Sequence, residues 1–154
     1  IMGTLMIFLF GVGYAKPVPV NPRNFRNYKT GMALTALAGP VSNLLMAFLS
    51  MAVLRGFYAF LPYGTALTIA ITFFQQFALI NISLAIFNLL PIPPLDGFRI
   101  VANLLPPKWS YYVDRYQMYI TMAVMLLVFS GVLSRPISYL SIHIYNFIVR
   151  VLMF

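Results

Sequence analysis

The residues that could take part in chemistry are concentrated in one stretch, Asn88 to Gly97, which reads NLLPIPPLDG. Its prolines remove backbone donors and break a helix, and broken backbone at membrane depth is tolerated only where protein buries it or water reaches it. Asp96 is the only carboxylate within an apolar segment, where an ionised carboxylate needs a partner such as a metal ion or an arginine. Gly97 allows the backbone to turn tightly or to approach another group. The stretch is therefore a candidate site for binding a metal ion or for pairing charges.

A purely structural interpretation of Asp96 stays open at this point. The carboxylate could cap the helix that resumes at Gly97 and pair with Arg99, without any role in chemistry. That interpretation gives no reason for Asn88 or for the Pro-x-Pro-Pro pattern that follows it. We therefore favour a functional role for Asp96, with a metal ion or an arginine as its partner, and keep the capping role as the alternative.

The composition indicates that the segments around this stretch lie in a membrane. Of the 154 residues, 62% are hydrophobic and 8% are charged, with a mean hydropathy of +0.90, whereas about a quarter of the residues in a soluble domain are charged. The net charge of +8 comes from ten Lys and Arg residues against two acidic residues. These cations lie between apolar segments and form no stripe on a polar domain, which argues against nucleic-acid binding. They favour loops at an anionic cytoplasmic membrane surface. The lack of cysteine excludes disulfides and thiolate metal sites.

The apolar segments predict an all-α membrane protein, a polytopic helical bundle of about four to five transmembrane segments. One segment is broken at the proline-rich LDG stretch. Loops are expected at 15–30 and 106–115, and their excess of cations places both in the cytoplasm. The segment over 31–54 is expected to end at Arg55 and Gly56 and to be followed by a short turn that holds Pro62 and Gly64. A further break is expected at Arg135-Pro136. The predicted apolar segments are residues 2–14, 31–54, 65–90 with a continuation to 105, 116–133 and 137–154.

The stretch from Asn88 to Gly97 resembles the third motif of the site-two-protease family, Asn-x-x-Pro-x-x-Pro-x-Asp-Gly, position for position. Two further pieces agree with this family. Ala15 to Asn24, AKPVPVNPRN, looks like its proline-rich loop, and Ala38 to Asn43, AGPVSN, looks like the small-residue motif at the start of the following helix. The three pieces occur in the family's order and spacing, and the resemblance spans roughly Gly3 to Leu105.

In this family two histidines of an HExxH helix and the aspartate of the LDG motif hold a zinc ion, so the resemblance implies that Asp96 is the third protein ligand. Such a set leaves a fourth zinc position for water, as a hydrolytic zinc requires. Asn88 matches the family asparagine that steadies the substrate or the oxyanion, a task that suits an amide N–H. Pro91 and Pro94 are assigned with Asn88 to substrate binding. The implied function is a zinc-dependent intramembrane endopeptidase that hydrolyses peptide bonds in or near transmembrane segments of membrane-protein substrates.

The sequence departs from the family pattern at the metal site. It contains no HExxH, and its only histidine is His143, far downstream. Because the family's HExxH helix precedes the part that resembles residues 2–14, we expect an N-terminally truncated chain that carries only the LDG part of the site and is inactive alone. We predict a single membrane-embedded domain over 1–154, with a protease-like core at 1–105 and C-terminal helices at 106–154, in a multi-pass protein of a prokaryotic cell membrane.

Two other functions remain compatible with the same residues. A non-catalytic membrane scaffold of this fold would bind or chaperone membrane partners and would hold no zinc. A transporter would use the carboxylate for ion coupling, but it predicts pseudo-symmetric halves, and we find none in the sequence. The basic loop from Lys16 to Lys29 is either a lipid-facing loop that sets topology or an extended edge that pairs with an unwound substrate.

Polar and small residues inside the other apolar segments have structural and functional interpretations. Gly39, in the small-residue motif, either allows close helix packing or borders the active site. Gln75, Gln76 and Asn81 are expected to form interhelical hydrogen bonds, with a substrate path as the alternative. His143 belongs to a polar stripe that we expect near the membrane interface, and we do not count it as a ligand. The stripe comprises Tyr139, His143, Asn146 and Arg150.

Overall fold

The computed structural model describes residues 25, 27–93, 95–102 and 106–153. Every regular element within them is an α-helix, which confirms the predicted all-α class. The predicted segment at 2–14 and the proline-rich piece at 15–24 lie outside the described residues. The helices are α2 (Tyr28–Phe60), α3 (Thr65–Leu89), α4 (Asp96–Ala102), α5 (Pro107–Phe129) and α6 (Ser134–Met153).

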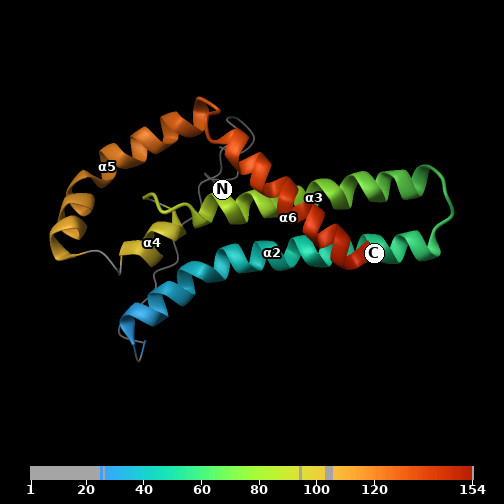
Figure 1. The fold of residues 1–154 in the computed structure, drawn as a ribbon, viewed down its shortest axis with the longest axis horizontal. Coiled ribbons are helices and arrows are strands. Elements are labelled where there is room, and N and C mark those ends of the chain that lie inside the picture. The colour runs from blue at the N-terminus through green and yellow to red at the C-terminus, as the bar shows by residue number, and fades with distance from the viewer. Residues whose placement is uncertain (1–24, 26, 94, 103–105, 154) are drawn as a thin grey trace, which may run out of the picture.

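The long helices α2 and α3 lie side by side in opposite directions, and α6 crosses them at a slant (Figure 1). Alanines at the contact between α2 and α3 let the two backbones approach closely, which is how helices associate in lipid. The core at this contact is formed by Ala47, Met51 and Leu54 of α2, Ala78 and Ile82 of α3, and Ile148 of α6.

Two hydrogen bonds made by serine hydroxyl groups link these helices inside the apolar packing. Ser50 Oγ of α2 donates a hydrogen bond to the Phe74 carbonyl oxygen of α3 at 2.8 Å. Ser83 of α3 and Ser141 of α6 share a hydrogen bond at 2.9 Å. Both bonds satisfy polar atoms where little water is available, and they fix the register of the three helices.

Helix α2 is longer than the sequence predicts. The expected end at Arg55 and Gly56 is wrong, because the helix continues to Phe60, but the turn predicted to hold Pro62 and Gly64 is confirmed. The Arg55 guanidinium donates to the Leu152 carbonyl oxygen at the end of α6, so this charge is held by a tertiary contact and does not mark the end of a segment. The helix ends before Pro62, where Leu61 is extended (φ −98°, ψ 134°) because a following proline disfavours helical backbone.

The C-terminal half also differs from the prediction. The loop expected at 106–115 is helical from Pro107 onward. Pro107 occupies the first turn of α5, where a backbone N–H has no hydrogen-bond partner within the helix, so a proline there costs no bond. The break expected at Arg135-Pro136 lies earlier, in the turn between α5 and α6, where Gly131 adopts φ 74°, a conformation that favours glycine. Pro136 falls in the first turn of α6, where proline is tolerated.

Two helices are long and apolar enough to cross a membrane, Thr30–Phe60 and Thr65–Leu89. Arg115–Phe129 and Ser134–Leu152 pass the same test only as a pair, bent by 72° at the turn between them. The described residues therefore contain two candidate spans, or up to three if the bent pair is one span. These helices support the prediction of a membrane protein.

We predict that Leu54→Ala destabilises the helix pair more than Leu45→Ala. Leu54 is fully buried, whereas Leu45 on the same helix is exposed. Lipid chains are as apolar as leucine, so Leu45→Ala loses little, while Leu54→Ala leaves a cavity and lowers the free energy of unfolding by about 2 kcal/mol. Titration with SDS, followed by circular dichroism, measures both variants. Equal losses would show that Leu54 is not in the core.

Candidate functional site

The proline-rich stretch forms a tight turn between α3 and α4. Helix α3 ends at Leu89, and Leu90 is extended (φ −59°, ψ 131°). The turn is held by short-range backbone bonds, from Ile92 N–H to the Leu90 oxygen at 2.8 Å and from Leu95 N–H to the Ile92 oxygen at 2.9 Å. The chain then re-enters a helix at Asp96. The sequence therefore predicted the break in the helix correctly.

Gly97 is held against the end of α3. A Cβ atom at residue 97 would overlap the carbonyl group of Leu89 and would lie 2.6 Å from the Leu90 oxygen. Those neighbours are backbone atoms, which cannot rotate away as a side chain can. Only glycine therefore fits, and the contact places the start of α4 against the last turn of α3, which carries Asn88.

The carboxylate of Asp96 faces Gly39 of α2. A Cβ atom built on Gly39 would lie 3.6 Å from Asp96 Oδ2, which is van der Waals distance. The small-residue motif and the LDG motif, separated in sequence, thus meet at one point. The position of Gly39 is compatible with both interpretations left open for it, because it lies beside Asp96 and also where α4 packs against α2.

Arg99 gives the carboxylate a partner within α4. Arg99 Nε lies 3.9 Å from Asp96 Oδ1, and the two side chains are 51% and 39% exposed. A half-exposed pair at this distance contributes less than about 1 kcal/mol, because water screens it. Asp96 also lies in the first turn of α4, where a negative charge is favourable. The pair with Arg99 expected in the purely structural interpretation is therefore present, and the carboxylate stays accessible.

The described residues alone do not fit a complete zinc site. A hydrolytic zinc takes three protein ligands, and the described part of the chain brings together no group of three His, Cys, Asp or Glu side chains. Asp96 has the right donor chemistry for one ligand. His143 lies on the exposed face of α6, where its Nδ1 donates to the Tyr139 carbonyl oxygen at 2.8 Å and its ring lies 4.2 Å from the Tyr139 ring.

The other predicted site residues lie at or near the turn. Asn88 is half-buried in the last turn of α3, and Pro91 is exposed just after it. Pro94 lies outside the described residues. Asn81 was expected to bond between helices, but its Nδ2 donates to the Phe77 carbonyl oxygen of the same helix at 2.8 Å. Gln75 of α3, which was also expected to bond between helices, does so with the Tyr145 side chain of α6. Serines form further interhelical bonds, which the sequence analysis did not consider.

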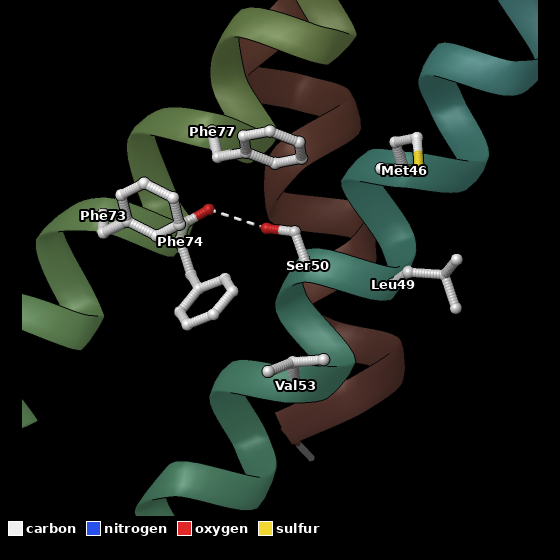
Figure 2. Close-up of a pocket in the computed structure, with 7 residues that line it drawn as sticks. All are labelled: Met46, Leu49, Ser50, Val53, Phe73, Phe74 and Phe77. Atoms are coloured by element: carbon white, nitrogen blue, oxygen red, sulfur yellow. Dashed lines mark hydrogen bonds between the residues drawn. The ribbon is translucent and has the colours of Figure 1, made fainter.

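An apolar groove lies between α2 and α3 and is separate from this turn (Figure 2). Its volume is about 220 Å³. Ser50 supplies the hydroxyl in its lining, and that hydroxyl is bonded to the Phe74 carbonyl oxygen (Figure 2). With no titratable group, the groove cannot supply acid, base or metal chemistry, so Asp96 remains the candidate site. The groove is lined by Met46, Leu49, Ser50, Val53, Phe73, Phe74 and Phe77.

We predict that Gly97→Ala and Gly56→Ala have opposite effects on stability. The methyl group at residue 97 would overlap backbone and should lower the free energy of unfolding by about 1–3 kcal/mol. At Gly56, inside α2, nothing lies within 4 Å of the added atom, so alanine should be neutral or stabilising by up to about 1 kcal/mol. SDS titration measures the free energy of unfolding of both variants. If Gly97→Ala were as stable as Gly56→Ala, the close approach of α4 to α3 would be wrong.

Comparison with known proteins identifies relatives over most of the chain. The model of peptidase family M50 matches residues 4–130. The protein named "Putative zinc metalloprotease YwhC" from Bacillus subtilis is 42% identical over 110 residues, which cover 68% of this chain and 49% of that protein. "Putative zinc metalloprotease MJ0611" from Methanocaldococcus jannaschii is 31% identical over 115 residues, covering 73% of this chain and 52% of that protein.

The chain spans about half the length of these two relatives. No solved structure gives a significant match. The family match covers all three motifs and extends through α2, α3 and α4 to the end of α5. From this match and the two relatives, the chain belongs to peptidase family M50, the site-two-protease family that its motifs resemble.

Proposed function

We propose that this chain is part of a zinc-dependent intramembrane endopeptidase, which hydrolyses peptide bonds in or near the membrane-spanning segments of other membrane proteins. Membership of family M50 and the names of two relatives support a metalloprotease. The observation that carries the proposal is the position of the Asp96 carboxylate, at the break between α3 and α4 and facing Gly39 of a candidate membrane span.

In this proposal Asp96 supplies one protein ligand of the zinc ion. Zinc, when bound, would supply the Lewis-acid chemistry of the reaction. These 154 residues contain one histidine and no glutamate, so the proposal assigns the two histidine ligands and the catalytic glutamate to other residues of the full protein. Gly39 contributes by its lack of a side chain, because a larger residue would cover the Oδ2 side of the carboxylate.

Asn88 is the second functional residue of the proposal. It lies in the last turn of α3, and the contact of Gly97 with Leu89 keeps that turn next to Asp96. Its amide N–H groups would donate to the substrate carbonyl or to the oxyanion that develops from it, and Pro91 would contact the substrate beside it. Backbone freed by the broken helix provides a place where an extended substrate can lie.

A non-catalytic membrane scaffold of the same fold is the second candidate function. It is favoured by the pair between Asp96 and Arg99, which partners the carboxylate without a metal ion. Such a scaffold would bind membrane-protein partners through its helices. It predicts that the full-length protein, purified without chelators, contains no stoichiometric zinc, whereas the protease predicts one zinc ion held partly by Asp96.

We predict that Asp96→Asn in the full-length protein abolishes proteolysis but not membrane insertion. Loss of a ligand removes several kcal/mol of transition-state stabilisation, so cleavage should fall by about a hundredfold or more. The matched control is Asp114→Asn, which changes the only other acidic residue of this chain and should cleave normally. The rate is measured on a membrane-protein substrate in vesicles. Normal cleavage by Asp96→Asn would contradict the ligand assignment.

We predict that Asn88→Ala lowers kcat by about 10²–10³-fold, as the loss of an oxyanion donor does in other hydrolases. KM should change less, because the donor acts mainly in the transition state. Asn81→Ala is the control, since Asn81 lies on the same helix and its amide nitrogen donates to the Phe77 carbonyl oxygen of that helix. Steady-state kinetics of the full-length protein separates kcat from KM. A rise in KM with an unchanged kcat would assign Asn88 to substrate binding alone.

A further inference from the structure

The first half of α5 has a face on which cations and aromatic rings are combined. Starting from Lys108, the positions that share this face recur at intervals of three and four residues, as one side of an α-helix requires. Asp114, the acidic residue of this helix, falls outside the face by helical register. We call it the cationic–aromatic face; it comprises Lys108, Trp109, Tyr112, Arg115, Tyr116 and Tyr119.

This face is turned away from the rest of the described chain. Trp109 is 63% exposed and Tyr119 is 69% exposed. Among the side chains of α5 that the structure describes, only Val124 is buried. Helix α5 arches away from the α2, α3 and α6 packing (Figure 1) and packs extensively against no other described helix. The face therefore needs a partner outside the described residues.

The same line of the helix becomes purely apolar further along. After Tyr119 it continues through Met122, Leu126 and Phe129, and all three are exposed, Phe129 by 74%. The stretch from Arg115 onwards belongs to the bent pair that is apolar enough to cross a membrane. A change from cations and aromatic rings to exposed apolar residues along one line is what a helix shows where it passes from lipid headgroups into hydrocarbon.

We propose that the cationic–aromatic face binds anionic phospholipid headgroups at one surface of the membrane. Lys108 and Arg115 would pair with the phosphates, and the rings of Trp109 and Tyr112 would lie at the headgroup level, where their apolar bodies and polar tips are both satisfied. Arg115 Nη1 already donates to the Tyr111 hydroxyl at 3.4 Å, which orients the guanidinium along the helix surface. The charge of this face is positive, so it selects anionic lipids over zwitterionic ones.

This inference is independent of the proposed catalytic role of Asp96, and it agrees with the predicted cytoplasmic location of this region, since the cytoplasmic leaflet is the anionic one. Each cation near the membrane surface is worth about 1 kcal/mol, so each should enrich anionic lipid beside the face by about fivefold at low salt. Screening should reduce the enrichment in about 1 M salt.

Trp109 provides the probe, because it is the only tryptophan of the chain. The full-length protein, with any tryptophan outside these 154 residues replaced by phenylalanine, is placed in vesicles of equal parts phosphatidylcholine and phosphatidylglycerol, with bromine atoms on the acyl chains of one lipid or the other. Bromine quenches tryptophan fluorescence on contact. We expect brominated phosphatidylglycerol to quench Trp109 several-fold more than brominated phosphatidylcholine. In the double variant Lys108→Gln/Arg115→Gln, the two brominated lipids should quench Trp109 equally.

Arg135→Gln/Arg150→Gln is the matched control, since it removes two exposed cations from α6 and leaves the face intact. This variant should keep the preference for phosphatidylglycerol. Equal quenching by both lipids in the unmodified chain would overturn the selectivity for anionic headgroups. No quenching by either lipid would show that protein, such as a second copy of the chain, covers the face, and would overturn the proposal entirely.

Discussion

The steric contact between Gly97 and the carbonyl end of α3 determines where the carboxylate of Asp96 can lie. A side chain at residue 97 would overlap the backbone of Leu89, so α4 can begin at this place only because residue 97 is glycine. The proline-rich turn brings the start of α4 against the end of α3, and α4 then packs against α2. One backbone contact therefore brings the last turn of α3, Asp96 and Gly39 together, and the arrangement of the candidate site depends on it.

The helices that carry this site are held together by close packing and by hydroxyl groups. Lipid chains offer apolar side chains as good an environment as a protein core does, so burying them provides little driving force in a membrane. Alanines let α2 and α3 approach each other, and the serine bonds from Ser50 to the Phe74 carbonyl and between Ser83 and Ser141 fix their register. Helix α5 does not pack extensively against any other described helix, which leaves its cationic–aromatic face available to lipid.

Features governed by local rules were predictable from the sequence. Helix α3 was predicted within a residue at each end, because Gly64 and Pro91 mark its limits, and the break before Asp96 followed from the prolines. The end of α2 was missed, because Arg55 is held by the Leu152 carbonyl, 97 residues further along the chain. The motif identified Asp96, but its position beside Gly39 is a tertiary contact that no local pattern encodes.

We propose that Asp96 is a zinc ligand in a metalloprotease of family M50. Its position next to Gly39 presents the carboxylate beside a candidate membrane span, and the half-exposed pair with Arg99 contributes little stability. X-ray absorption at the zinc edge, on the full-length protein and on its Asp96→Asn variant, tests this claim most directly. We expect a carboxylate oxygen among the zinc ligands of the full-length protein. In the Asp96→Asn variant either that oxygen or the zinc ion itself should be missing. An identical, fully occupied zinc shell in both proteins would contradict it.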